Sequence, residues 1–193
     1  MYSAGIYIHI PFCTIKCIYC DFYSITDQEK TIPRFVSAIQ REIEICSNDT
    51  GDWMFDTIFI GGGTPSLLNA KSIELIINTL KKKFDLNNIK EFTIEVNPGE
   101  ASLKRLKKYN NLGINRLSIG VQSLNPTHLN FLGRAHSSKQ ALETIKNAQT
   151  AGFENINCDL IYLIPGQDFN DWVKELKKII QLNPDHISAY TLT

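Results

Sequence analysis

Six strand-like segments separated by helix-like stretches constrain the fold of this chain more than any other feature. Apolar residues recur at helical spacing over residues 32–46 and 70–84. Further helix-like stretches are the short, basic residues 102–109 and the segments 137–151 and 168–182, which cap, Gly and Pro residues bound. The strand-like segments between them begin near Ile6, Thr57, Glu91, Asn115, Asn155 and His186. A repeated strand–helix–strand order predicts parallel strands joined by right-handed crossover connections, and therefore an α/β fold.

The predicted strands alternate between apolar and polar residues, whereas buried parallel strands are usually apolar throughout. In the third predicted strand, Phe92 and Ile94 share one face while Thr93 and Glu95 share the other. A flat sheet with one wet face and a barrel with a polar lumen both explain this alternation, and the crossover connections favour the barrel. Because an eight-stranded barrel fills its interior with bulky apolar layers, six strands with polar interiors predict an open, partial (β/α)6 barrel of the TIM type that holds a ligand.

Composition and charge bound the class of protein. The 193 residues are enough for one domain with a hydrophobic core, and we expect a single domain over residues 1–193. The 20 Lys and Arg residues balance the 20 Asp and Glu residues, so no net field favours nucleic acid. No apolar run approaches the roughly 20 residues of a membrane helix, and the N-terminus has no signal-peptide pattern. These features predict a cytoplasmic protein without a transmembrane segment.

Three cysteines follow the first predicted strand with the spacing C-x-x-x-C-x-x-C. They are Cys13, Cys17 and Cys20, and a cluster of this kind in a reducing compartment indicates metal binding before disulfide formation. Three thiolates on one tight loop can hold three irons of a [4Fe–4S] cluster. Because ligation of such a cluster normally takes four cysteines, one iron would stay open to a substrate or cofactor. The loop also lies at the carboxyl end of a strand, where barrel enzymes carry out their chemistry.

A structural zinc site is the alternative interpretation of these cysteines. Together with His9 they would supply four ligands, the closed tetrahedral set that structural zinc prefers. However, His9 lies within the predicted strand, and the sequence has no second C-x-x-C pair. The other two cysteines, Cys46 and Cys158, lie on apolar faces of a predicted helix and strand, which is typical of small core residues.

Several motifs together resemble one family. The stretch Y-I-H-I-P-F-C-T-I-K-C-I-Y-C at residues 7–20 is similar to the radical S-adenosylmethionine (SAM) superfamily. More narrowly, it resembles the oxygen-independent coproporphyrinogen III oxidases and the related HemW heme chaperones. The supporting motifs are G-G-G-T-P-S at 61–66, E-V-N-P-G at 95–99, S-I-G-V-Q-S at 118–123, L-G-R at 132–134 and D-L-I-Y at 159–162. The resemblance covers essentially the whole chain.

The resemblance implies a [4Fe–4S] cluster on Cys13, Cys17 and Cys20, with the amino and carboxylate groups of SAM on the fourth iron. An electron passed to the cluster would break the S–C5′ bond of SAM and give a 5′-deoxyadenosyl radical. SAM contacts are implied for Tyr7, Tyr19, Gly62, Gly63 and Thr64. Further polar contacts, to the same SAM or to a second cofactor molecule, are implied for Glu95, Gln122, Arg134 and Asp159.

The residue pattern agrees with these implied contacts. Three glycines at residues 61–63 follow a predicted strand, and glycine lets backbone N–H groups approach a ligand closely. Four of the implied contact residues fall on the inner face that the period-two alternation defines, namely Tyr7, Glu95, Gln122 and Asp159.

Departures from the family pattern bear on function. The oxidases carry a further cysteine two residues after the third, and here that position is Phe22, as in the C-D-F pattern of HemW proteins. The oxidases also have an N-terminal extension, whereas few residues precede Tyr7. Leu163 stands where family members usually have glycine, and a side chain there would either tighten the barrel mouth or simply be tolerated. Because family members are much longer, we expect a last helix and a C-terminal domain to be missing from this chain.

The sequence therefore predicts a HemW-like heme chaperone that binds a [4Fe–4S] cluster, SAM, and heme or a porphyrin, and that passes heme to a recipient protein. The superfamily resemblance implies a capacity for reductive cleavage of SAM. One alternative is an oxygen-independent coproporphyrinogen III oxidase, which uses the same chemistry. The second alternative is a zinc-binding structural domain.

Overall fold

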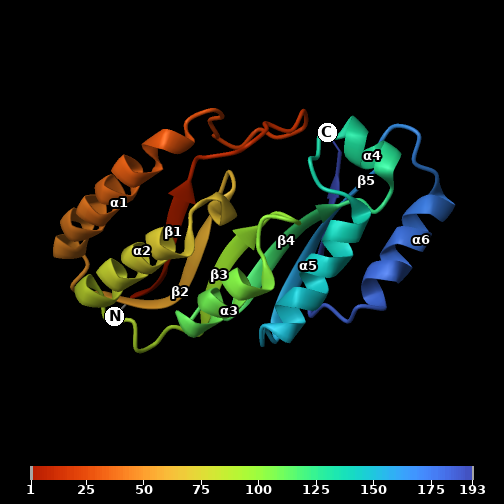
Figure 1. Cartoon of the computed structure of the whole chain (residues 1–193). Coiled ribbons are helices and arrows are strands. Elements are labelled where there is room, and N and C mark those ends of the chain that lie inside the picture. The colour runs from red at the N-terminus through yellow and green to blue at the C-terminus, as the bar shows by residue number, and fades with distance from the viewer. Residues whose placement is uncertain (1, 193) are drawn as a thin grey trace.

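The six strands of the chain form one parallel sheet in sequence order, β1-β2-β3-β4-β5-β6 (Figure 1). The structure is a computed structural model that describes residues 2–192. The strands are β1 (Tyr2–Ile10), β2 (Trp53–Gly62), β3 (Glu91–Val96), β4 (Arg116–Gln122), β5 (Asn155–Tyr162) and β6 (His186–Thr191). Every pair of neighbouring strands is parallel, as the strand–helix–strand order predicts.

Helices connect the strands, and all but the short α4, which lies at the carboxyl end of the strands, run along the outer face of the curved sheet (Figure 1). They are α1 (Ile32–Cys46), α2 (Ala70–Lys83), α3 (Leu103–Asn111), α4 (Pro126–Phe131), α5 (Ser138–Thr150) and α6 (Phe169–Ile180), with short 3-10 turns η1 (Glu29–Thr31), η2 (Ser47–Asp49) and η3 (Pro65–Leu67). Side-chain caps start five of these helices, through Asn69, Ser102, Asn125, Ser137 and Asp168. The ranges of α1, α2, α3, α5 and α6 agree with the five predicted helices to within a few residues, whereas no range was predicted for the short α4.

Two strand boundaries differ from the sequence-based expectation. β1 and β2 begin at Tyr2 and Trp53, four residues before Ile6 and Thr57, while the other four strands begin within one residue of their predicted starts. In the added segments, the rings of Tyr2 and Trp53 lie 5.5 Å apart across the two strands. Both rings are exposed, so the apolar alternation that marks the rest of each strand does not extend to them.

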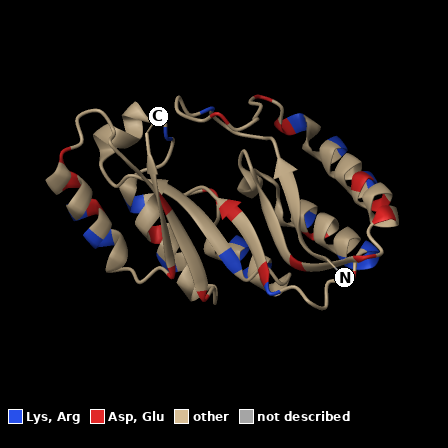
Figure 2. Cartoon of the chain, turned by 180° about the vertical axis from the view of Figure 1, so that it is seen from behind, with Lys and Arg blue, Asp and Glu red and all other residues tan. Residues whose placement is uncertain are grey.

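The core lies between the sheet and the helices. Outward-facing strand residues such as Ile60, Ile94 and Leu117 have no exposed surface, and they pack in one cluster with helix residues such as Ile76 and Ile145. Burial of this apolar face is the main contribution to stability. Charged positions gather on the helices and interrupt the strands at few points (Figure 2). The curled sheet with helices on one face confirms the predicted open, partial barrel.

The carboxyl ends of the strands meet at one end of the half-barrel. The long loop after β1 runs across this end toward α4, and the turns after β2 to β5 meet it there (Figure 1). This is the end at which barrel proteins build their sites. Among residues 2–192, no helix combines the length and the apolar character needed to cross a membrane.

Candidate functional site

The loop after β1 carries the three predicted ligand cysteines and is held by its own backbone. Cys13 N–H donates to the carbonyl of Ile25 at 3.0 Å, and Ile25 N–H donates to the carbonyl of Pro11 at 2.7 Å. Phe12 is buried and packs edge-to-face on Phe35 of α1, with ring centroids 5.1 Å apart. These contacts close a loop on which all three cysteines are free thiols and partly exposed.

Two of the cysteine sulfurs already accept hydrogen bonds from other segments. Thr64 Oγ1 donates to Cys13 Sγ at 3.5 Å, and Arg134 Nη1 donates to Cys17 Sγ at 3.5 Å. Arg134 thus places a positive charge beside the Cys17 sulfur. Burial and the neighbouring cysteines raise the pKa of Cys20. A positively charged group bound at the loop would therefore stabilise the Cys20 thiolate.

The turn after β2 lies directly against this loop. Gly63 N–H donates to the carbonyl of Ile10 at 2.7 Å, and Thr64 N–H donates to the carbonyl of Phe12 at 2.7 Å. A Cβ on Gly63 would lie 2.9 Å from Cys13 Sγ, and one on Gly62 would lie 2.7 Å from the His9 ring. Gly62 also has a φ of 115°, a conformation that favours glycine. The glycines thus allow a close approach that side chains would prevent.

A cavity of about 630 Å³ opens between the cysteine loop and the polar inner face of the sheet. Most of the predicted site residues line it, and they come from six separate segments. They are Tyr19, Cys20, Gly62, Gly63, Thr64, Glu95, Gln122, Arg134 and Asp159. The period-two prediction of a polar, ligand-sized lumen is therefore confirmed at the level of the fold, while the role of each residue remains a prediction.

Tyr7 does not itself line this cavity, although its ring lies 6.0 Å from that of Phe59, which does. Its side chain is 57% exposed on the edge strand β1, and its hydroxyl lies 3.1 Å from His9 Nδ1. His9 Nε2 lies 2.9 Å from the carbonyl of Tyr23. Because a carbonyl only accepts, Nε2 carries the proton, and Nδ1 accepts from the Tyr7 hydroxyl. Both nitrogens of His9 are therefore engaged, which argues against its use as a zinc ligand.

Two carboxylates carry the negative charge of the cavity. Burial raises the pKa of Glu95 to about 7, although its Oε2 accepts a 3.0 Å hydrogen bond from Gly62 N–H. Burial also raises the pKa of Asp159, against hydrogen bonds from Ser118 and Asn157. Since burial disfavours the charged form of each group, a cation bound in the cavity would stabilise both carboxylates.

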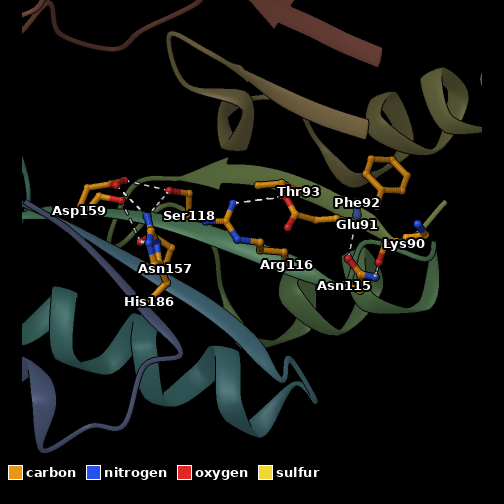
Figure 3. Close-up of polar contacts among 11 residues, drawn as sticks. Lys90, Glu91, Phe92, Thr93, Asn115, Arg116, Ser118, Asn157, Asp159 and His186 are labelled. Atoms are coloured by element: carbon orange, nitrogen blue, oxygen red, sulfur yellow. Dashed lines mark hydrogen bonds and ion pairs between the residues drawn. The ribbon is translucent and has the colours of Figure 1, made fainter. Parts of the chain in front are cut away.

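Deeper in the lumen, polar side chains of β4, β5 and β6 satisfy one another (Figure 3). Asn157 Nδ2 donates to Ser118 Oγ at 2.9 Å and to Asp159 Oδ1 at 2.8 Å. Its Oδ1 accepts from Ser188 Oγ at 3.0 Å and lies 2.6 Å from His186 Nδ1. Without these partners each buried polar group would cost about 1–3 kcal/mol, so the network explains how the lumen remains polar.

At the amino-terminal end of the strands, Arg116 closes the lumen. Arg116 Nη1 donates to Thr93 Oγ1 at 3.3 Å and pairs with Glu91 Oε1 at 3.7 Å (Figure 3). Thr93 Oγ1 in turn donates to Glu91 Oε1 at 2.9 Å. The Arg116 side chain is 15% exposed, so it forms a charged floor beneath the cavity.

Sequence reasoning did not single out Asn97, although the structure places it at the centre of the site. Asn97 Nδ2 donates to Thr64 Oγ1 at 3.0 Å, and its Oδ1 accepts from Arg134 Nη2 at 2.6 Å. Asn97 had two usable signals, because it belongs to the E-V-N-P-G motif and continues the inner face of its strand. Its partners, however, lie more than 30 residues away in the sequence.

The residues present fit an iron–sulfur cluster with a small polar cofactor beside it. Arg134 Nε is buried without a hydrogen-bond partner among the described residues, so a donor lies ready at the cysteine loop. Gly62 and Gly63 line the cavity without side chains, so their backbone is open to a ligand beside the cysteine loop. Three free thiols on one loop match the donor set of a cluster with one open iron.

Comparisons with known proteins agree with this geometry. The family model described as "Radical SAM superfamily" matches residues 7–179. The chain belongs to the radical SAM superfamily. Membership of this superfamily implies a [4Fe–4S] cluster and SAM.

Named relatives are similar over nearly the whole chain. The chain is 38% identical to the heme chaperone HemW of Haemophilus influenzae, over 98% of this chain and 51% of the relative. It is 37% identical to "Radical S-adenosyl methionine domain-containing protein 1, mitochondrial" of Danio rerio, over 99% of this chain and 43% of the relative. The chain thus spans about half the length of the curated relatives that it matches.

A solved structure shares the fold closely. It is coproporphyrinogen III oxidase (HemN) from Escherichia coli, described as a radical SAM enzyme, with a TM-score of 0.91 and 31% sequence identity. The match covers 100% of this chain and 44% of that chain. Both groups named by the sequence resemblance, the HemW chaperones and the oxidases, are therefore among its relatives.

Proposed function

We propose that this chain is the cluster-binding and SAM-binding core of a HemW-like heme chaperone. Cys13, Cys17 and Cys20 would hold a [4Fe–4S] cluster, and the cavity beside them would hold SAM. When bound, this pair supplies the one-electron reductive cleavage of SAM. The observation that carries the proposal is the meeting of the cysteine loop and a polar, ligand-sized cavity at the carboxyl ends of the strands.

The chain's own residues would bind and orient the cofactor. Gly62 and Gly63 line the cavity where their turn packs on the cysteine loop, so the methionyl end of SAM would lie against their backbone. Glu95 and Asp159 would accept hydrogen bonds from the polar groups of a positively charged ligand, which would offset the cost of burying them. Tyr19 lies between the cavity and the apolar cluster of Leu132 and Ile161, so its ring would exclude water from one side.

Heme handling is supported by the HemW relatives and by the character of the cavity mouth. Phe22 lines the cavity and is 68% exposed, where the sequence resemblance to the oxidases would place a further cysteine. The next residue, Tyr23, is also largely exposed. The porphyrin ring has apolar faces, so the exposed Phe22 ring at the cavity offers it a contact surface. We propose that heme is then passed to a recipient protein in the cytoplasm.

Two measurements on anaerobically reconstituted protein test this proposal. Equilibrium dialysis with SAM should show saturable binding that Cys17→Ser abolishes and Cys46→Ser retains. Heme titration followed at the Soret band should show saturable binding, weakened by Phe22→Ala, and transfer of the heme to an apo-hemoprotein. Heme uptake that never saturates would contradict the chaperone role even if SAM binding is found.

An oxygen-independent coproporphyrinogen III oxidase is the second candidate, favoured by the close structural match to HemN. Anaerobic incubation with coproporphyrinogen III, SAM and dithionite distinguishes the two functions. A chaperone should give no protoporphyrinogen, whereas its steady formation would establish the oxidase. The zinc-binding structural domain is disfavoured because both ring nitrogens of His9 are engaged by Tyr7 and Tyr23.

A further inference from the structure

Asn97 follows β3 directly and joins two side chains that each reach a cysteine sulfur. Its amide contacts Thr64 Oγ1 at 3.0 Å on one side and Arg134 Nη2 at 2.6 Å on the other. Thr64 donates to Cys13 Sγ and Arg134 donates to Cys17 Sγ, each at 3.5 Å. One side chain thus connects donors to two of the three proposed cluster ligands.

The chemistry of these groups determines the direction of every bond in the chain. Arginine only donates, so the Asn97 atom that faces Arg134 must be the carbonyl oxygen. The Asn97 NH₂ group therefore faces Thr64 and donates to its hydroxyl oxygen. Since the Thr64 oxygen is accepting, its own proton is free to point at Cys13 Sγ. The orientation of the amide thus directs the Thr64 proton toward the sulfur.

The surrounding structure holds Asn97 in this position. Its backbone N–H donates to Ser66 Oγ at 3.3 Å, and Ser66, which has no exposed surface, donates to Glu100 Oε2 at 2.8 Å. Arg105 Nη1 fixes the same segment by donating to the carbonyls of Ser66 at 2.6 Å and Glu100 at 3.0 Å. These bonds order the segment before any ligand binds.

The guanidinium of Arg134 is fixed from a second side. Its Nη2 also donates to the carbonyl of Gly120 at 3.0 Å, while Nη1 points to Cys17. The group is therefore held between the carboxyl ends of β3 and β4, with one edge turned toward the cysteine loop. Loss of the Asn97 oxygen would remove the shorter of the two bonds that hold Nη2.

We propose that Asn97 is a positioning residue that directs these two donors at the Cys13 and Cys17 sulfurs and thereby raises the reduction potential of the bound cluster. Hydrogen bonds to cluster sulfurs are one of the determinants of that potential. They withdraw electron density from the thiolates and stabilise the reduced cluster, which carries one more negative charge. The inference rests on the proposed binding of a [4Fe–4S] cluster by these cysteines.

Asn97→Asp is the sharpest variant because it keeps the shape of the side chain and reverses one bond. A carboxylate only accepts, so it would take the Thr64 proton away from Cys13 while keeping the contact with Arg134. Thr64→Val removes the same hydroxyl donor without adding a charge. Thr64→Ser is the matched control, because it keeps the hydroxyl and should keep the wild-type potential.

The test is a redox titration of the reconstituted cluster without SAM, using dithionite and mediator dyes and following the reduced cluster by electron paramagnetic resonance. We expect Asn97→Asp and Thr64→Val each to lower the reduced-to-oxidised ratio at a fixed potential by about tenfold, which is about 59 mV for a one-electron couple. Because both variants remove one donor, the effect of Asn97→Asp should be smaller in a Thr64→Val background than in the wild type.

The possible results separate this inference from the proposed function. If the wild type assembles no cluster, the proposed function fails and the inference fails with it. If every variant assembles a cluster and Thr64→Val keeps the wild-type potential, the proposed function stands and the inference is overturned. A full effect of Asn97→Asp in the Thr64→Val background would also overturn it, because the added charge alone would then explain the shift. If Asn97→Asp does not fold, the Thr64→Val and Thr64→Ser pair still decides the question.

Discussion

The backbone N–H of Gly62 donates a 3.0 Å hydrogen bond to Glu95 Oε2, so the glycine-rich turn after β2 is tied to a carboxylate on the neighbouring strand. Among residues 2–192 this is the one hydrogen bond of the Glu95 side chain, and it does not offset the burial that raises the Glu95 pKa to about 7. The carboxylate is therefore prepared for a positively charged ligand at a cost to the stability of the free protein.

The pH dependence of stability should reveal this cost. The folded-state pKa of Glu95 lies above its ordinary value of 4.5, so its contribution to the free energy of unfolding falls as pH rises from about 4.5 to about 7. Glu95→Gln removes the buried charge and should stabilise the ligand-free protein at pH 8 by up to about 3 kcal/mol, with little gain at pH 4.5. Urea unfolding at both pH values measures the difference.

A matched control for this variant is Glu143→Gln, at an exposed position on α5. The stability of Glu143→Gln relative to the wild type should be the same at pH 4.5 and at pH 8. Equal stability of Glu95→Gln and the wild type at pH 8 would mean that the buried carboxylate carries no penalty.

Gly62→Ala should destabilise the protein more than Gly166→Ala does. Both glycines have a positive φ, 115° and 83°, which costs an L residue about 1–2 kcal/mol. Only at Gly62 would the new Cβ also meet a side chain, the His9 ring at 2.7 Å, whereas nothing lies within 4 Å at Gly166. Chemical denaturation of the two variants separates the effect of the clash from that of the backbone strain. Equal losses in the free energy of unfolding would show that the His9 ring moves away at no cost and would contradict this prediction.

Leu163→Gly should stabilise the protein, which is unusual for a change to glycine. Leu163 has a φ of 61° and is 67% exposed, so it bears the strain of a left-handed conformation and buries little surface. Relief of about 1–2 kcal/mol of strain, less the greater flexibility of glycine in the unfolded chain, leaves a gain of about 0.5–1 kcal/mol. Leu75→Gly, within helix α2, should instead lose about 1 kcal/mol. A lower melting temperature for Leu163→Gly would refute this account of the strain.

A buried cluster outside the cavity joins α6 to the segment after β4. Ser123 Oγ donates to Glu175 Oε1 at 2.7 Å, and His128 Nδ1 lies 3.7 Å from the same oxygen. Glu175→Ala would leave two buried polar groups without this partner and should cost about 1–3 kcal/mol. The adjacent Lys174→Ala, whose side chain is 76% exposed, should change stability by less than about 0.5 kcal/mol. Similar losses of stability in Glu175→Ala and Lys174→Ala would show that the effect comes from helix α6 as a whole rather than from the buried cluster.

The inner face of the barrel could be predicted because it depends on a local signal. Side chains alternate along a strand, so the placement of Glu95 or Asp159 toward the lumen follows from neighbours in the sequence. The starts of β1 and β2 were not predicted, because Tyr2 and Trp53 are exposed and are ordered by pairing with each other across two strands. Strand pairing of this kind has no counterpart in the local pattern.

The connections within the site could not be read from the sequence for the same reason. Asn97 acquires its role from Thr64 and Arg134, which lie 33 and 37 positions away. His9 matched a motif, but its link between Tyr7 and the carbonyl of Tyr23 depends on how the cysteine loop folds back over β1. Motifs identify residues that lie near a site, whereas the direction of each hydrogen bond requires the fold.

The most direct test of the central claim is the iron and acid-labile sulfide content of the chain after anaerobic reconstitution. The account predicts about four irons and about four sulfides per chain in the wild type. It predicts loss of both in Cys17→Ser and retention of both in Cys46→Ser, whose cysteine lies at the end of α1 away from the loop. A colourless wild-type protein with zinc and no sulfide, or a Cys17→Ser variant that keeps the full cluster, would contradict it.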